Sequence, residues 1–198
     1  MLGRILAFRG EEAWSNEELL GFTFVLTLAG LDTVAAAIVF TMQHLALNPD
    51  LRRSLIANPE LVGPVLEEML RLEPPAPGVT RVTTRAVEVC GVEIPTGASV
   101  VLYLATANRE PTRYEDPDKF DLAHSAFGHM TFGGGIHRCL GSHLARRELR
   151  LVVEEFHKII PDYEIATGFE PHIKWPAGTL RLTSLPLIFP VLQGNSST

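Results

Sequence analysis

Cysteine is scarce in this sequence, with only Cys90 and Cys139 among 198 residues. Two cysteines cannot build the framework of bridges that stabilises small secreted proteins, and no pair has the CxxC spacing of a structural zinc site. The first ten residues do not resemble a secretory signal. These absences favour the reducing cytosol, so we expect a cytoplasmic protein.

A basic excess is absent as well. The formal net charge is −6, and no tract rich in lysine and arginine interrupts the chain. The sequence therefore lacks the electrostatic surface expected for nucleic acid or for an anionic membrane. With 46% hydrophobic and 20% charged residues, the composition is that of a globular protein. The length suits one domain or part of a larger one.

The longest hydrophobic segment predicts one helix over residues 15–47. Ser15 or Asn16 can cap its start, and Pro49 follows its end. Residues 19–42 are apolar nearly all round, so the helix either spans a membrane or is surrounded by protein. Asp32 at mid-span argues against lipid, and we expect a buried helix. The helix would be about 48 Å long. Since 198 residues hardly suffice to cover it, a covering part of the protein is expected to be missing.

The rest of the chain predicts a mainly α protein with small β-sheets. Short helices are expected over residues 49–57 and 61–72, a hairpin over 87–94 around Gly91, and a strand over 99–104. Residues 105–138 are mostly irregular, and so long a loop is usually functional. A helix over 139–160 and short strands over 163–189 complete the prediction.

The segment FGGGIHRCLG, residues 132–141, carries the strongest chemical signal. Glycines let a backbone approach a flat ligand and adopt positive φ. Cys139 is expected in the first turn of a helix, where unpaired N–H groups favour a thiolate. Such a cysteine is a metal ligand, a nucleophile or an unreactive core residue. A thiol-dependent hydrolase is disfavoured because no third, orienting group is visible.

The spacing Phe-x-x-Gly-x-His-x-Cys-x-Gly, with Phe132, Gly135, His137, Cys139 and Gly141 in place, resembles the signature of the cytochrome P-450 family. The resemblance implies that Cys139 is the axial thiolate ligand of the iron of haem b. It also implies that Phe132 packs beside the thiolate and that His137 hydrogen-bonds a haem propionate. Gly135 would belong to the same haem-binding loop.

The motif Ala29-Gly30-Leu31-Asp32-Thr33 interrupts the long helix with residues that suit it poorly. It is similar to the family's oxygen-binding groove. The resemblance implies that Gly30 makes room for dioxygen, that the Thr33 hydroxyl helps deliver protons, and that Asp32 feeds the proton relay. The alternative is a Thr33 bonded to its own helix and an Asp32 paired with a distant arginine.

Glu68 and Arg71 stand at i and i+3 on one predicted helix, a spacing that by itself says little. By resemblance they are a buried pair that braces the haem side of the fold. The usual third member is an arginine, and Lys119 occupies the place where we expect it. Lysine cannot form a bidentate fork, so a weaker network is expected. Arg81 is expected to bind the second propionate, the alternative being a solvated strand-edge arginine.

Several minor assignments remain. Cys90 is interpreted as a small apolar filler. A solvated helix face and a docking patch for an acidic electron-transfer protein both stay open for three arginines. These are Arg146, Arg147 and Arg150. Lining of the substrate pocket is expected from Val79, Thr80, Gly178 and Thr179.

The resemblance covers residues 15–189. Within the family, the sequence looks most like the soluble bacterial camphor-hydroxylating branch. The resemblance implies the C-terminal half of the cytochrome P-450 fold. Residues 1–198 would then be the C-terminal haem-binding portion of one domain, with the N-terminal half lying before Met1. The implied activity is a haem-thiolate monooxygenase that inserts one atom of dioxygen into an apolar small molecule. A ferredoxin-type or flavin donor would supply two electrons. The alternative is a haem-binding fragment without turnover.

Overall fold

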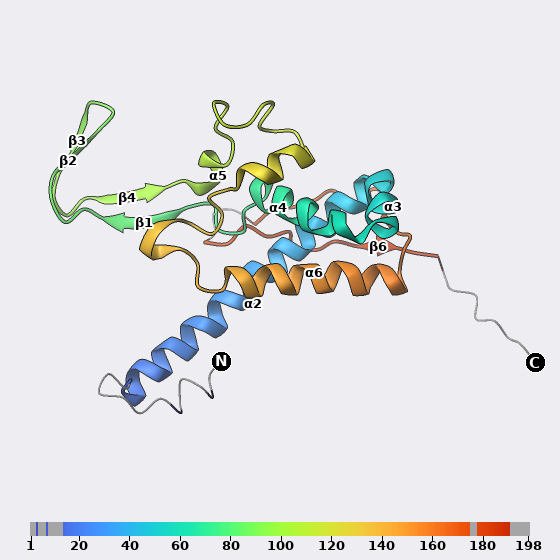
Figure 1. Ribbon diagram of the computed structural model, residues 1–198, viewed down its shortest axis with the longest axis horizontal. Coiled ribbons are helices and arrows are strands. Elements are labelled where there is room, and N and C mark those ends of the chain that lie inside the picture. Colours follow the sequence, from blue (N-terminus) through green and yellow to red (C-terminus); the bar gives the residue numbers. More distant parts are fainter. Residues whose placement is uncertain (1–2, 4–6, 8–13, 175–177, 191–198) are drawn as a thin grey trace, which may run out of the picture.

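The computed structural model describes residues 3, 7, 14–174 and 178–190 (Figure 1). The predicted fold class is confirmed, since helices dominate and the sheets are small. The helices are α2 (Asn16–Leu47), α3 (Pro49–Ala57), α4 (Val62–Leu72), α5 (Leu104–Ala107) and α6 (Ser142–Ile159). Short 3-10 turns are η1 (Pro59–Leu61), η2 (Leu122–Phe127) and η3 (Gly135–His137).

Helix α2 begins and ends where its local signals predict. The Glu18 N–H donates to Ser15 Oγ at 3.2 Å, and the Ser15 N–H donates to Glu18 Oε2 at 2.8 Å. This reciprocal pair satisfies free backbone donors at the helix start. The helix ends at Leu47, and Pro49 opens α3.

Only the second half of α2 is buried. Ala36, Phe40 and Leu45 belong to one core with residues of α4 and α6, among them Val65 and Leu149. The first half extends away from the other helices (Figure 1), and its large apolar side chains are 58–73% exposed. They are Leu20, Phe24, Val25, Leu28 and Leu31. The helix is therefore buried as predicted from Ala36 onward and uncovered before it within the described residues, in agreement with the expectation that this length of chain hardly suffices to cover the helix.

Within the described part of the chain, α2 is long and apolar enough to cross a membrane. The most apolar stretch of 18 residues is only 11% buried. The core helix of a soluble protein passes the same test of length and composition, so this finding alone does not place the chain in a bilayer.

Three two-stranded antiparallel sheets accompany the helices. Strand β1 (Val79–Val82) pairs with β4 (Ser99–Leu102), β2 (Val87–Val89) with β3 (Val92–Ile94), and β5 (Glu164–Ile165) with β6 (Leu187–Ile188). The predicted hairpin is confirmed, and its turn consists of Cys90 at φ +51° and Gly91 at φ +78°. Cys90 is exposed in this turn, so its interpretation as an apolar filler is wrong.

Helix α6 starts later than predicted. It begins at Ser142, three residues after Cys139, with Gly141 at its N-cap. The Cys139 N–H instead donates to the Phe132 carbonyl at 2.8 Å, which holds the cysteine in the preceding loop. Cys139 therefore lies just before the helix and not in its first turn.

Candidate functional site

The loop around Cys139 is shaped by its glycines. Gly133 and Gly135 have φ values of +66° and +61°, which side chains with a Cβ rarely adopt. The hydrogen bond from the Cys139 N–H to the Phe132 carbonyl closes the loop. Ile136 is 97% exposed and Leu140 is 73% exposed on either side of the exposed thiol. The loop thus presents a sulfur atom flanked by uncovered apolar side chains.

Cys139 opens onto a cavity of about 510 Å³ between α2 and the start of α6. This volume lies within the range of sites for small molecules and cofactors, roughly 300–1,000 Å³. The cavity brings Cys139 and Phe132 together with Gly30 and Thr33 of α2. A Cβ added to Gly30 would meet no atom within 4 Å, so this glycine borders open space. The remaining lining is mostly apolar and includes Phe22, Val25, Leu26, Ala29, Leu144 and Ala145.

These residues fit a haem held by one sulfur ligand. The cavity is mostly apolar, and the Cys139 thiol lies at its wall. Gly30 of α2 also lines the cavity, and its lack of a side chain lets a flat group approach the helix backbone closely. Among the described residues, no group of three His, Cys, Asp or Glu side chains could hold a bare metal ion. A macrocycle that brings its own four nitrogen ligands needs no such group.

Thr33 and Asp32 lie in different surroundings. Thr33 lines the cavity, and its hydroxyl donates to the Ala29 carbonyl one turn back at 2.8 Å. Asp32 is not among the residues that line the cavity, and its Oδ1 lies 3.7 Å from Arg181 Nη1. Both alternative interpretations, a threonine bonded to its own helix and an aspartate beside a distant arginine, therefore describe contacts that exist.

Several residues that were expected to bind haem or substrate do not line this cavity among the described residues. Arg81 is exposed on β1, and its Nη1 donates to the Thr80 carbonyl at 2.9 Å. His137 is exposed in η3. Both side chains are accessible to propionates, but the structure does not bring them to the thiol. The expected substrate contacts are also absent from the lining, namely Val79, Thr80, Gly178 and Thr179.

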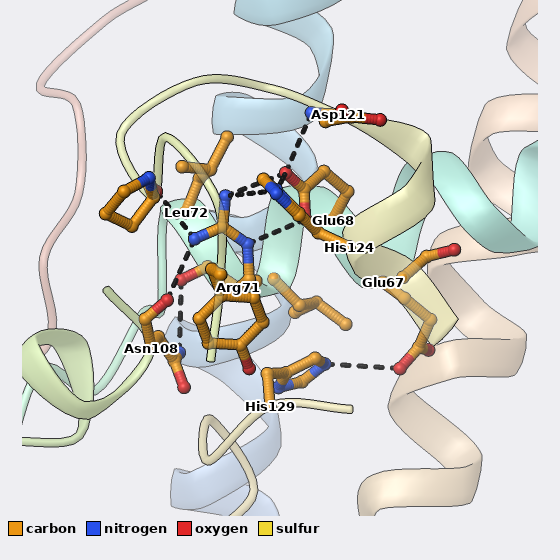
Figure 2. Close-up of polar contacts among 12 residues, drawn as sticks. Glu67, Glu68, Arg71, Leu72, Asn108, Asp121, His124 and His129 are labelled. Carbon is orange, nitrogen blue, oxygen red and sulfur yellow. Dashed lines mark hydrogen bonds and ion pairs between the residues drawn. The ribbon is translucent and has the colours of Figure 1, made fainter. Parts of the chain in front are cut away.

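Glu68 and Arg71 form the expected buried pair, and Figure 2 shows it at the centre of a larger network. Arg71 Nε donates to Glu68 Oε2 at 2.7 Å, and Arg71 Nη2 donates to Oε1 at 2.8 Å. The remaining Arg71 donors reach the carbonyls of Asn108, Pro117 and Lys119. Every polar group of the pair is thus satisfied in the interior, as a buried ion pair requires.

The third side chain of this network is His124 and not Lys119. His124 Nδ1 lies 3.1 Å from Glu68 Oε1 and 3.2 Å from Arg71 Nη2 (Figure 2). The Lys119 side chain is 73% exposed and pairs with Asp116, so only its carbonyl joins the network. The prediction for Lys119 is wrong because η2, which follows Asp121, returns the chain to α4.

Asn108 links this network to the cysteine loop, a role that no sequence pattern predicts. Its side chain is fully buried, its Nδ2 donates to the Arg71 carbonyl and to Thr131 Oγ1, and its Oδ1 accepts from the Met130 N–H at 2.7 Å. Thr131 Oγ1 in turn donates to the Leu70 carbonyl. The chain entering residue 132 is therefore tied to α4. An asparagine in an irregular segment gave no signal of this role.

The three arginines of α6 do not form one patch. Arg146 makes two hydrogen bonds to Glu67, and Arg150 pairs with Glu154 on its own helix. Arg147 is exposed. Two of the three guanidinium groups are thus engaged by carboxylates, which weakens the docking interpretation.

Comparison with known proteins gives consistent matches. A family model described as Cytochrome P-450 matches residues 4–164. The biotin biosynthesis cytochrome P-450 of Bacillus subtilis is 34% identical over 189 residues, covering 96% of this chain and 48% of that protein. The monooxygenase PikC of Streptomyces venezuelae is 37% identical, covering 87% of this chain and 42% of that protein. The chain therefore spans about half the length of these relatives.

Solved structures agree with the sequence matches. The structure of P450BioI in complex with a hexadec-9Z-enoic acid ligated acyl carrier protein has a TM-score of 0.85 and 34% identity, covering 90% of this chain and 46% of that one. The testosterone complex of CYP109E1 from Bacillus megaterium has a TM-score of 0.88 and 29% identity, covering 94% and 52%.

Proposed function

Since the chain belongs to the cytochrome P-450 family, we propose that it is the C-terminal haem-binding portion of a haem-thiolate monooxygenase. One observation carries the proposal. Cys139, Phe132, Gly30 and Thr33, expected from separate motifs, line one apolar cavity. A cysteine with an unrelated role would have no reason to face a helical glycine and threonine more than a hundred residues earlier in the chain.

In this proposal Cys139 Sγ holds the iron of haem b, and Gly135 and Phe132 shape the loop that presents it. Haem ligated in this way supplies dioxygen activation with two electrons from a donor protein. Gly30 leaves room for a small molecule at the opposite wall of the cavity. His137 and Arg81 are exposed donors of the type that binds propionates.

Thr33 and Asp32 would handle protons. The Thr33 hydroxyl directs its hydrogen to the Ala29 carbonyl, so its oxygen can still accept a hydrogen bond from the cavity. Asp32 precedes it on the same helix and is partly exposed beside Arg181. A carboxylate in contact with solvent can take up a proton and pass it along the helix surface toward Thr33 Oγ1.

The proposed substrate is an apolar small molecule, because the cavity walls are mostly apolar. A ferredoxin-type or flavin protein would donate the electrons. The proposed localisation is cytoplasmic, with no nucleic acid partner and no membrane. The exposed first half of α2 would be covered by the part of the protein that the relatives have and this chain does not span.

Ligation is tested by spectroscopy on the haem-loaded protein. The reduced protein with carbon monoxide should show the strongly red-shifted Soret band of a thiolate ligand. Cys139→Ser should lose this band, and Cys90→Ser, which removes the other exposed thiol, should keep it. An unchanged band in Cys139→Ser would end the proposal.

Turnover separates a monooxygenase from a haem-binding protein without activity. With an electron donor and an apolar substrate, the wild type should couple reductant consumption to hydroxylated product. Thr33→Ala should consume reductant but release hydrogen peroxide in place of product, because proton delivery at this position is lost. A wild type that shows the thiolate band but never forms product from a broad panel of apolar substrates supports the alternative.

A further inference from the structure

A second ion-pair cluster lies beside the Glu68–Arg71 network and starts at the neighbouring residue of α4, Glu67. Glu67 accepts two hydrogen bonds from Arg146 of α6, from Nε to Oε1 at 2.6 Å and from Nη2 to Oε2 at 2.8 Å. The side chains are 26% and 30% exposed, respectively. This two-point geometry fixes the plane of the guanidinium as well as its position. Because 79 residues separate the partners, the contact joins α4 to the helix that follows the cysteine loop.

The fixed guanidinium lies directly on the cysteine loop. The Arg146 Cζ stands 4.4 Å from the centre of the Phe132 ring, a cation–π arrangement. Phe132 is also the residue whose carbonyl accepts the Cys139 N–H. Arg146 therefore packs on the ring of the residue whose carbonyl holds the backbone N–H of Cys139.

His129 completes the cluster from the other end of the loop. Its side chain is 3% exposed, its Nε2 lies 3.2 Å from Glu67 Oε2 (Figure 2), and its Nδ1 accepts from the Thr131 N–H at 3.2 Å. A nitrogen that accepts from a backbone N–H carries the lone pair, so the proton sits on Nε2 and is donated to Glu67. Its ring centre lies 5.8 Å from that of Phe132.

The Glu67–Arg146 pair of this cluster stays ionised at neutral pH. Burial by itself would raise the pKa of the Glu67 carboxyl, but the hydrogen bonds from Arg146 and His129 and the charge of Arg146 outweigh it and hold the pKa at about 2. The hydrogen bond with Glu67 also raises the pKa of Arg146. Both shifts favour the ionised forms of Glu67 and Arg146.

We propose that Glu67, His129 and Arg146 are positioning residues for Cys139, which act through Phe132 to hold the sulfur in the geometry required for haem ligation. This inference rests on the proposed function, because it assigns a role to the loop only if Cys139 is the iron ligand. It differs from general bracing of the fold, since Arg146 and His129 contact Thr131 and Phe132 of the loop, and no direct hydrogen bond joins their side chains to the Glu68–Arg71 pair among the described residues.

The test compares three variants of the haem-loaded protein. Arg146→Met removes the fork and the stacking charge, Arg146→Lys keeps the charge but not the planar fork, and Arg147→Met removes the neighbouring exposed arginine as a control. Hydrogen exchange by mass spectrometry reports the amides of residues 132–140, which include the Cys139 N–H. We expect at least about tenfold faster exchange there in both Arg146 variants, with no change in peptides from residues 149–156.

The carbon monoxide complex provides the second readout. Both Arg146 variants should lose the thiolate band with time faster than the wild type, and Arg147→Met should match the wild type. Glu67→Gln keeps the shape of the carboxylate but removes its charge. It should also speed exchange at residues 132–140 and the loss of the thiolate band, and it replaces Arg146→Met in the test if that variant does not fold. Wild-type exchange in Arg146→Met, full rescue by Arg146→Lys, or equal loosening of residues 149–156 would overturn the proposal. A wild type without the thiolate band would instead reject the proposed function.

Discussion

Replacement of His124 by alanine tests whether this histidine is the third member of the Glu68–Arg71 network. His124 is 4% exposed, and its Nδ1 lies within 3.2 Å of both charged partners. A hydrogen bond to a charged group contributes about 1.5–3 kcal/mol. The ring also packs edge-on against Tyr114, at 5.6 Å between centres, and this contact is lost too.

The cost should nevertheless stay below that of breaking the pair itself. Glu68 Oε1 keeps its hydrogen bonds from Arg71 and from the Asp121 N–H, so the carboxylate is not left bare. Removing one partner of a buried ion pair costs about 3–5 kcal/mol. We therefore expect His124→Ala to lower the unfolding free energy by about 2–3 kcal/mol, as one hydrogen bond and the ring contact are lost.

Urea unfolding of the haem-loaded protein, followed by circular dichroism, measures this loss. The matched control is Lys119→Ala, which should leave the urea midpoint unchanged. It removes an exposed side chain but keeps the carbonyl that accepts from Arg71. If Lys119→Ala lowered the midpoint as much as His124→Ala, the assignment of the third member would be wrong.

Three further predictions follow from the loop and its supports. Gly135→Ala should weaken haem retention and lower the unfolding free energy by about 1 kcal/mol, because the backbone φ at this position is +61°. Gly134→Ala is the control and should be tolerated, since the added Cβ would meet only the Met130 side chain at 3.5 Å. Asn108→Ala should lower the unfolding free energy by about 2–4 kcal/mol in urea titrations, because the fully buried amide and its hydrogen bonds to the Arg71 carbonyl, Thr131 Oγ1 and the Met130 N–H are lost. In acid, the unfolded chain protonates Glu67 near its ordinary pKa of 4.5 and the folded protein only near 2. The stabilisation, about 3 kcal/mol, is thus complete above pH 4.5 and lost as the pH falls to 2, a loss that Glu67→Gln should not show in pH-dependent unfolding.

Local signals in the sequence predict local structure well here. The bounds of α2 follow from Ser15 and Pro49, and the hairpin follows from alternation on both sides of Gly91, because caps, prolines and turns act within a few residues. The shared cavity of Cys139, Gly30 and Thr33 agrees with the motifs that named those residues. Their chemical roles remain predictions.

The remaining features depend on partners that are distant in the chain. His124 meets Glu68 across 56 residues, Arg146 meets Glu67 across 79, and Asn108 meets Met130 across 22. Nothing in the sequence near His124 says which carboxylate it will meet. The predicted start of α6 is wrong for the same reason. The hydrogen bond from the Cys139 N–H to the Phe132 carbonyl keeps Cys139 in the loop, and the helix begins at Ser142.

The two thiols of this chain give every molecule its own reference for chemical labelling. Cys90 sits on an exposed turn far from the cavity wall, and Cys139 is exposed at that wall. An alkylating reagent should therefore modify both cysteines in the haem-free protein and only Cys90 when haem iron is bound to the Cys139 sulfur. The ratio of the two labelled peptides would then read out cofactor occupancy in a crude sample, with differences in protein amount cancelling within each molecule.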